Sequence, residues 1–362
     1  MRSDIADFDD VEALLSADRD GLLQSVALAG AQVRAIAEAR REGVLDPLGD
    51  LRPRSLVIVT GSSAVGADAV AFVVAAMGAR VDVPIVVIPT MPSWIGPLDV
   101  VVLAGDDAGD LALIDAGARG ARRRAEVVTL APLEGPLRDA VAGRIVDLSP
   151  RVYTAPQFRF CGLVAGLLAV CAALVQVRTT GAVVDFDDLA SALDAEAAAN
   201  HPEREAFRNQ AKLLASKMQE RETIWSGDDT QTDVLAHRAS VVFATVAGVT
   251  GTPLTLPAAL GAVKLRSAAG AAPVDSIFFD PQFDAPLDQP PQLMVVSSVQ
   301  RQWQTRQRLG AVAADILVDL VDLVDPDETA VAGHDDMMGY LVLMLRTEMA
   351  AVYLRLLGAR RA

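Results

Sequence analysis

The hydrophobic residues of the first half of the chain fall into short continuous runs separated by longer helical stretches. The runs, rich in valine, isoleucine and leucine, cover residues 56–60, 85–89, 100–104, 126–130 and 144–148. Because apolar residues in them are continuous and do not alternate with polar ones, the pattern predicts strands covered on both faces. The helices expected between them cover residues 64–77, 110–122 and 136–141. Repeated strand–helix units predict a doubly wound parallel sheet with right-handed crossovers.

A second, less regular α/β region follows. Its expected strands cover residues 223–226, 276–279 and 293–298, with a proline-rich loop at 279–291. Its expected helices cover residues 187–199, 206–219, 235–248, 306–324 and 337–357. Residues 9–42 have a helical pattern with a polar break at 16–21. The sequence therefore predicts two doubly wound, flavodoxin-like α/β domains with flanking helices, 1–180 and 181–362.

The stretch 160–177 carries no charge and, as a helix, would reach about 27 Å, just under the thickness of a bilayer core. It is rich in alanine and glycine, has no aromatic belt, and no second span accompanies it. We therefore expect a buried helix that closes the first domain, and no membrane partner.

Composition and charge narrow the choice of partners. Of the 362 residues 52% are hydrophobic, which suits a large core, and the formal net charge is −15. An acidic chain repels phosphate backbones, so we expect no nucleic-acid partner. The basic cluster of note is interpreted as a solvated helix end, and comprises Arg119, Arg122, Arg123 and Arg124.

The cysteines and the first residues bear on the compartment. Cys161 and Cys171 would lie about 15 Å apart on one helix, too far for a disulfide, and free thiols suit a reducing cytosol. The first fifteen residues are acidic and lack the apolar region of a signal peptide. Both features predict a cytoplasmic protein.

The first predicted strand ends in a turn of small polar residues, Thr60-Gly61-Ser62-Ser63, before a helix. This arrangement directs backbone N–H groups, hydroxyls and the positive end of the helix dipole towards an anion. The turn lacks both the Walker pattern and the G-x-G-x-x-G dinucleotide pattern. An anion-binding loop and a plain strand–helix turn with a serine cap both remain open.

Several stretches, in order, carry a resemblance to a known family. Residues 61–68 (GSSAVGAD) are similar to its first glycine–serine loop, and 156–159 (PQFR) with Gly162 to its "QPR…G" turn. Residues 209–215 (NQAKLLA) are similar to its "NPAK.LA" helix, and the closing helix at 337–357 also fits. The chain thus resembles the sugar isomerase (SIS) fold and, within it, the bifunctional phosphoglucose/phosphomannose isomerase-like proteins, among them the TobH-like group.

The resemblance implies the strand order 2-1-3-4-5, with a ligand crevice at the tips of strands one and three. The residues that it implies for a sugar-phosphate pocket are Gly61, Ser62, Ser63, Gly105, Asp106, Asp107, Gln157 and Arg159. In active isomerases of the family the second loop is rich in serine and threonine, but here residues 104–110 hold no hydroxyl. Two unit charges about 4 Å apart repel by about 4 kcal/mol at an effective dielectric of 20, so Asp106 and Asp107 oppose a phosphate. Alternatively they cap the following helix, and then fill the space of the phosphate.

Isomerisation between aldose and ketose needs a positioned general base and a ring-opening acid, which the family supplies as a glutamate and a histidine. This chain has no glutamate between 222 and 328 and no histidine between 237 and 334. The histidines are interpreted as a cap, a surface or interface residue, and a loop residue, in the order His201, His237 and His334. Only a rearrangement would bring in the second-domain carboxylates Asp228, Asp229 and Asp233. No catalytic residue is assigned.

Other chemistries lack their patterns. The two cysteines and three histidines make no zinc pattern, the GxSxG elbow is absent, and residues 325–328 lack EF-hand spacing, so we expect neither metal nor cofactor. Two hypotheses remain. The favoured one is a non-catalytic SIS-domain protein, a pseudoenzyme that acts as a sugar-phosphate sensor or as an interaction scaffold and pairs as a homodimer through apolar stripes in 306–324 and 337–357. The alternative is an active glucose-6-phosphate, mannose-6-phosphate and fructose-6-phosphate isomerase with relocated catalytic residues.

Overall fold

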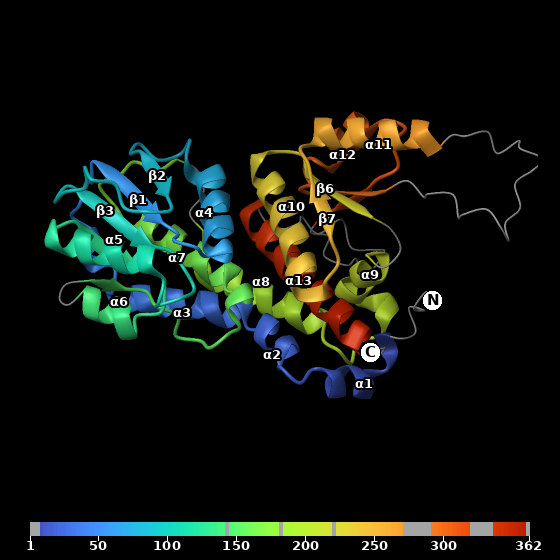
Figure 1. Ribbon diagram of the computed structural model, residues 1–362, viewed down its shortest axis with the longest axis horizontal. Helices are drawn as coiled ribbons and strands as arrows, with labels where there is room; N and C mark the ends of the chain where they lie inside the picture. The colour runs from blue at the N-terminus through green and yellow to red at the C-terminus, as the bar shows by residue number, and fades with distance from the viewer. Residues whose placement is uncertain are drawn as a thin grey trace, which may run out of the picture. The chain divides into compact units, whose positions relative to one another are not determined.

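The computed structural model describes residues 8–141, 145–180, 184–218, 222–270, 291–318 and 336–359. The chain divides into two compact units, the first Asp20–Ala198 and the second Met1–Arg19 together with Ala199–Ala362. These boundaries differ from 1–180 and 181–362. Helix α8 (Phe186–Ala199) pairs with α3 (Ala29–Arg41) of the first unit through Arg41 and Asp187, 3.1 Å apart, and through Arg34 and Asp194. Helix α1 (Val11–Ala17) packs instead on α13 (Asp336–Ala359) of the second unit (Figure 1).

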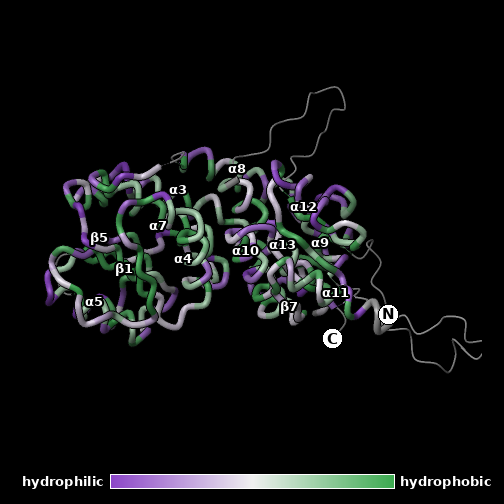
Figure 2. The backbone as a smooth tube through the Cα atoms, turned by 90° about the horizontal axis from the view of Figure 1, so that it is seen from above, coloured by the Kyte–Doolittle hydropathy of each residue, from purple (hydrophilic) through white to green (hydrophobic). Residues whose placement is uncertain are grey.

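The first unit is built around five parallel strands in the order β2-β1-β3-β4-β5, so the expected order 2-1-3-4-5 is confirmed. The strands are β1 (Ser55–Val59), β2 (Ile85–Ile88), β3 (Asp99–Leu103), β4 (Glu126–Thr129) and β5 (Val146–Asp147). Every residue of β1 and β3 is buried, as their continuous apolar runs predict. Figure 2 shows β1 as part of the hydrophobic interior of this unit.

Helices cover both faces of this sheet. The remaining helices of the unit are α2 (Leu22–Ala27), α4 (Ala64–Met77), α5 (Leu111–Arg122), α6 (Gly135–Ala140) and α7 (Phe160–Ala173). Helices α3 and α4 both pack on α7, whereas α5 packs on α6 and against β3 and β4. No helix lies between β2 and β3, a stretch that the structure describes in full, and the buried loop residues Met91 and Ile95 complete the core under α5.

Helix α7 is the stretch tested for a membrane span. It has fourteen residues, and its apolar side chains lie in the interior because α3 and α4 pack on it. Within the described ranges, no helix combines the length and hydrophobicity needed to cross a bilayer.

The second unit has a smaller sheet of four parallel strands in the order β7-β6-β8-β9. These are β6 (Thr223–Gly227), β7 (Gly251–Pro253), β8 (Gln292–Val296) and β9 (Asp315–Leu317). The helices are α9 (Gln210–Lys217), α10 (Thr230–Val242) with the π-helical turn Phe243–Ala247, α11 (Leu256–Gly270), α12 (Gln302–Leu309) and α13. Strands β6 and β8 are fully buried, and Trp225 of β6 stacks on Phe243 with ring centroids 5.7 Å apart.

The structure tests three of the expected helices. The helix expected at 306–324 is wrong over 310–318, because α12 already ends at Leu309, Gly310 follows with a φ of +59°, and β9 begins at Asp315; residues 319–324 lie outside the described residues. The helical pattern expected over 9–42 forms three helices, and the polar break expected at 16–21 falls between the first two of them and ends at Gly21, which has a φ of +65°. The helix expected at 337–357 is confirmed as α13, but its apolar residues pack against α9, α10 and α1, so core packing explains that stripe.

Two further differences from the expected elements lie in the second unit. Sequence reasoning missed β7 and α11 altogether. The strand expected at 276–279 lies outside the described residues, as does all of the loop expected at 279–291 except its last residue.

Candidate functional site

The glycine–serine turn lies at the C-terminal end of β1, where the sequence places it. Gly61 has a φ of +56°, which glycine adopts at little cost, and so turns the chain into α4. Ser63 is buried and caps α4, because its Oγ accepts a hydrogen bond of 2.9 Å from the backbone N–H of Gly66. The turn therefore does supply a serine cap, and the neighbouring Ser62 remains exposed with its own N–H and hydroxyl.

The partner of Ser62 is a carboxylate from the facing loop. Asp110 Oδ2 accepts hydrogen bonds from the N–H of Ser62 at 2.8 Å and from its Oγ at 2.5 Å. Asp110 Oδ1 accepts from the N–H groups of Ala112 at 2.8 Å and Leu113 at 3.1 Å, and thereby caps α5. One side chain thus joins the loop after β1 to the helix after β3, across the point where the strand order reverses.

These hydrogen bonds keep Asp110 ionised. Burial alone would raise the pKa of this carboxyl, but the bonds from the hydroxyl and N–H of Ser62 and from the amides of Leu113 and Ala112 outweigh it. The pKa of Asp110 therefore lies below its ordinary value. A carboxylate with four donors and a lowered pKa accepts a further proton poorly, so it makes a weak general base at neutral pH.

Of the two alternatives that the sequence left open for Asp106 and Asp107, the structure tests the one in which they cap the following helix. The cap of α5 is Asp110, because the helix begins at Leu111 and the residue before its first turn supplies the cap. Asp107 is exposed, and its Oδ1 accepts from the N–H of Gly109 at 2.7 Å within the loop. The backbone oxygen of Asp106 accepts a 3.2 Å hydrogen bond from Nη1 of Arg159. Capping by Asp106 or Asp107 is therefore wrong.

Gly105 is buried, and a Cβ at its position would lie 2.5 Å from Cδ1 of Leu113, so its role here is close packing on α5. Gln157 belongs to the short helical turn Pro156–Phe158 and is half-buried. Arg159 follows it, at the start of α7. Burial lowers the pKa of Arg159, although the negative charges of Asp106 and Glu134 oppose this shift. The fold thus joins Arg159 to the loop after β3 through the backbone oxygen of Asp106, and its place in a sugar-phosphate pocket stays a prediction.

A small cavity lies beside Arg159 in the same unit. It has a volume of about 30 Å³, enough for a water molecule or two, and is lined mainly by apolar side chains of α3 and α7 and by the loop after β5. Gln32 of α3 lines it and donates a 2.9 Å hydrogen bond to the backbone oxygen of Phe158. Its size excludes a sugar phosphate.

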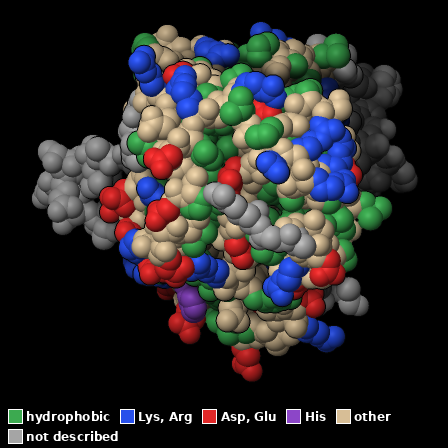
Figure 3. All heavy atoms as spheres, turned by 90° about the vertical axis from the view of Figure 1, so that its left-hand side faces the viewer, with side chains coloured by type: hydrophobic (Ala, Val, Ile, Leu, Met, Phe, Trp, Pro, Cys, Tyr) green, Lys and Arg blue, Asp and Glu red, His purple; other side chains and the backbone are tan. Residues whose placement is uncertain are grey.

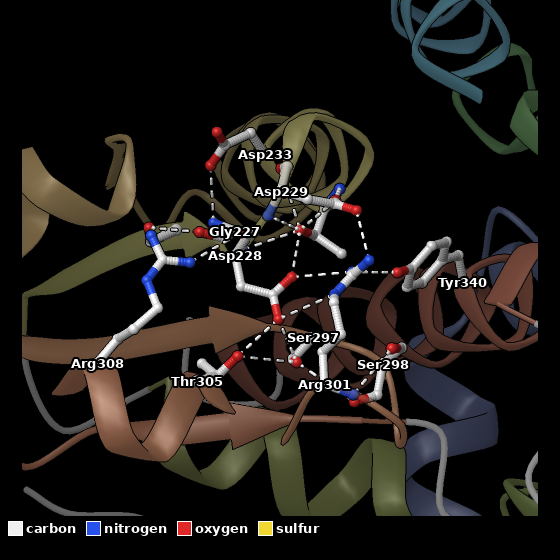
Figure 4. Close-up of polar contacts among 12 residues, drawn as sticks. Gly227, Asp228, Asp229, Asp233, Ser297, Ser298, Arg301, Thr305, Arg308 and Tyr340 are labelled. Atoms are coloured by element: carbon white, nitrogen blue, oxygen red, sulfur yellow. Dashed lines mark hydrogen bonds and ion pairs between the residues drawn. The ribbon is translucent and has the colours of Figure 1, made fainter. Parts of the chain in front are cut away.

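A second polar cluster occupies the equivalent edge of the other sheet (Figure 4). Asp228 directly follows β6, and Ser297 directly follows β8, the strand beside it. Asp228 Oδ2 accepts from Ser297 Oγ at 2.5 Å and from Thr305 Oγ1 at 2.6 Å, while Oδ1 accepts from Nη2 of Arg301 at 2.9 Å. Arg301 Nη1 also lies 2.6 Å from Oδ2 of Asp229.

Burial would raise the pKa of Asp228, but the hydrogen bonds from Ser297, Thr305 and Arg301 and the charge of Arg301 lower it below its ordinary value. Asp233 behaves differently, because burial and the nearby charges of Asp229 and Asp228 raise its pKa against a hydrogen bond from Gly227. Sequence reasoning named the three aspartates but not their partners. The signal available was Ser297-Ser298 at the end of an apolar run, which marks a second strand–helix turn with hydroxyls.

The remaining candidates that the structure describes lie on separate elements. His201 is exposed, and its Nδ1 accepts a 3.3 Å hydrogen bond from the N–H of Glu203, while His237 lies on α10 and His334 outside the described residues. Among the described residues, no three histidine, cysteine or acidic side chains are grouped to hold a metal ion. Of the arginine cluster at the end of α5, Arg119 pairs with Asp115 at 2.9 Å and Arg123 donates to the backbone oxygen of Ser93. On the face of the first unit in Figure 3, acidic and basic side chains are interspersed.

Comparison with known proteins places this geometry in a structural class. No protein-family model and no curated protein sequence matches the chain. Solved structures do. A candidate phosphosugar isomerase from Clostridium difficile 630 superposes with a TM-score of 0.59 at 10% identity, over 94% of each chain. The C-terminal domain of glucosamine-fructose-6-phosphate aminotransferase from Francisella tularensis gives 0.54 at 9% identity, over 93% of this chain and 96% of that one. The chain shares their fold.

A glucose-6-phosphate isomerase like protein from Thermus thermophilus adds a further match, with a TM-score of 0.52 at 16% identity over 97% of this chain and 93% of that one. At such low identity these structures establish the fold alone. The expected phosphosugar-isomerase type of fold, with two parallel sheets and flanking helices, is confirmed. Assignment to the bifunctional or TobH-like groups stays a prediction.

Proposed function

We propose that this chain is a non-catalytic protein with the phosphosugar isomerase fold, and that it acts as an interaction scaffold in sugar-phosphate metabolism. The observation that carries the proposal is the Asp110 carboxylate at the switch point of the first sheet. It takes the N–H and hydroxyl of Ser62 and two N–H groups of α5, the donors that an anionic ligand would need there.

Charge supports the same proposal. A phosphate placed against these donors would lie next to the ionised Asp110. Two unit charges about 4 Å apart repel by about 4 kcal/mol at an effective dielectric of 20, and the second charge of a phosphate monoester adds to this. Such a cost would weaken binding by about three orders of magnitude, since every 1.4 kcal/mol is tenfold. The scaffold role is therefore favoured over the sugar-phosphate sensor.

The chemistry of the crevice supports the absence of turnover. Moving a proton between adjacent carbons needs a base whose pKa is close to the working pH. In the first crevice the carboxylate at the switch point has a lowered pKa and a full set of donors. We also propose that the protein is cytoplasmic and pairs as a homodimer. Light scattering that shows a monomer would contradict the dimer.

The test is a titration of glucose-6-phosphate, fructose-6-phosphate and mannose-6-phosphate by calorimetry, with a coupled isomerase assay on the same protein. The proposal predicts neither binding nor turnover by the intact chain. Turnover of about 1 per second or more, an ordinary enzymatic rate, would establish the alternative of an active isomerase with relocated residues. Binding without turnover would establish the sensor.

A matched pair of variants tests whether Asp110 is the residue that prevents sugar-phosphate binding. Asp110→Asn keeps the size of the side chain and removes its charge, and we expect it to bind the sugar phosphates more tightly than the intact chain does. Asp115→Ala removes an exposed carboxylate from α5 and should leave binding unchanged. An equal gain in both variants would mean that overall charge, and not the position of Asp110, excludes the ligand.

A further inference from the structure

The hydrogen bonds around Asp228 are more than are needed to cap the helix that follows it. Helix α10 already has its N-cap, because Asp229 Oδ1 accepts from the N–H of Thr232 at 2.8 Å and the two residues form a reciprocal capping box. Asp228, one residue earlier, is therefore not the cap that begins the helix. Its carboxylate is nevertheless almost completely buried, with 2% of the side chain exposed.

The groups around Asp228 come from separate parts of the second unit. Ser297 directly follows β8, and Arg301 and Thr305 lie one helical turn apart at the start of α12. Arg301 gives two N–H groups, Nη2 to Oδ1 at 2.9 Å and Nε to Oδ2 at 3.4 Å. Arg301 Nη2 also lies 2.5 Å from the hydroxyl of Tyr340 on α13, so its guanidinium is held in place from a third element (Figure 4).

This donor set has the chemistry of an oxyanion site. A planar guanidinium that approaches through two N–H groups, with two hydroxyls beside it, is the usual combination for phosphate and sulfate. It lies at the C-terminal ends of β6 and β8, where the order of the second sheet reverses, which is the position at which open α/β sheets bind ligands.

We propose that Ser297, Thr305 and Arg301 form a binding site for a phosphate-sized oxyanion, and that Asp228 occupies it as a built-in competitor. Each sheet has a carboxylate at its switch point, but from a different strand of the pair: Asp110 belongs to the loop after β3, the third strand in its sheet, and Asp228 to the loop after β6, the second strand in its sheet. In the intact chain a free anion has to displace a carboxylate whose effective concentration is in the millimolar range or higher, as for any tethered ligand. This proposal concerns the second unit and does not depend on the proposed function.

The test removes the competitor. Inorganic phosphate and sulfate are titrated by calorimetry, at constant ionic strength, into the intact chain and into Asp228→Ala. We expect Asp228→Ala to bind phosphate at least about tenfold more tightly than the intact chain, which lies within the usual range of coupling between sites. The double variants Asp228→Ala/Ser297→Ala and Asp228→Ala/Arg301→Met should lose most of that gain, because each removes part of the donor set.

The control removes a different carboxylate of the same sheet. Asp315, at the start of β9, pairs with Lys217 at 2.8 Å and accepts from Gln292 at 2.6 Å, and Asp315→Ala lowers the negative charge equally. We expect no gain in phosphate binding there. A folded Asp228→Ala that binds phosphate no better than the intact chain would overturn the proposal, as would an equal gain in Asp315→Ala.

Folding of the variant supplies a second measurement. Asp228→Ala takes the carboxylate acceptor away from the hydroxyls of Ser297 and Thr305 and from Nε of Arg301, so phosphate or formate should raise its unfolding temperature more than chloride does. Asp228→Ser, which keeps one hydroxyl near Arg301, is measured alongside it. If neither variant folds in chloride, recovery of folded protein in phosphate supports the proposal, and failure to recover it there contradicts the proposal.

Discussion

Asp110 stabilises the fold in two ways, as the cap of α5 and as the acceptor for Ser62, and two substitutions separate these contributions. Asp110→Ala removes the cap of α5, at about 1 kcal/mol, and the charged hydrogen bonds to Ser62, which are discounted because Ser62 is exposed to water. The expected loss of unfolding free energy is about 2 to 3 kcal/mol. Asp110→Asn keeps the cap, because asparagine caps about as well as aspartate, but its NH₂ group cannot accept from the N–H of Ser62. Its expected loss is about 1 kcal/mol.

The assay is urea denaturation followed by circular dichroism, and pH gives a second readout. Because the pKa of Asp110 is lowered in the folded state, its contribution is present above the ordinary aspartate value of about 4 and is lost as the pH falls through the lower folded pKa. The difference between the intact chain and Asp110→Asn should therefore shrink below about pH 4. Asp115→Ala, which loses only an exposed pair with Arg119, should cost less than about 0.5 kcal/mol. If Asp110→Ala costs no more than Asp115→Ala, the reasoning about the first crevice is refuted.

Two further outcomes follow from the same structure. Gly61→Ala should destabilise the first unit by about 1 to 2 kcal/mol, because a side chain at its φ of +56° is strained and the new Cβ would lie 2.6 Å from the Asp110 carboxylate; an unchanged thermal midpoint would contradict this. Glu348 is buried beside Arg238 at 3.1 Å, and burial raises its pKa to about 7 against the pull of that arginine. A raised folded pKa contributes stability at low pH that is lost as the pH rises towards 7. The unfolding free energy of Glu348→Gln minus that of the intact chain should therefore rise by roughly 1 to 3 kcal/mol from about pH 5 to pH 8. A pH-independent difference between the two proteins would show that Glu348 does not titrate in this range.

The first sheet could be predicted from the sequence because each strand is a continuous apolar run with a turn behind it. Such runs are typical of strands buried on both faces, and the spacing leaves room for a helix after β1, β3 and β4. The second sheet was harder, since β7 and β9 have only three residues each and half-exposed or exposed side chains. Short edge strands have little pattern to detect. The apolar residues after Leu309 read as a continuing helix, whereas the positive φ of Gly310 ends it.

The misplaced bounds of this helix also explain why the residues around Asp228 were missed. A helix expected to begin at residue 306 leaves Arg301 and Thr305 in a loop, so their alignment towards Asp228 could not be inferred. In the first unit the sequence analysis expected a carboxylate in the loop that faces the glycine–serine turn, but named Asp106 and Asp107, whereas Asp110 is the one that contacts Ser62. Which aspartate of the loop faces the turn depends on where α5 begins, and Asp110, directly before Leu111, had the position of an N-cap.

Two carboxylates at two switch points have a common physical consequence. Hydroxyls, amides and a guanidinium gathered at one edge of a sheet are costly to bury without an acceptor, and a site that waits for a ligand gains stability only when that ligand is present. In this chain Asp110 and Asp228 supply the acceptors from within. The donors are therefore satisfied at every ligand concentration, and the two sheet edges keep their shape without a sugar phosphate. A protein whose donors at both switch points are satisfied by its own carboxylates is suited to present a constant surface to a partner. That constancy is the physical reason to favour the scaffold over the sensor.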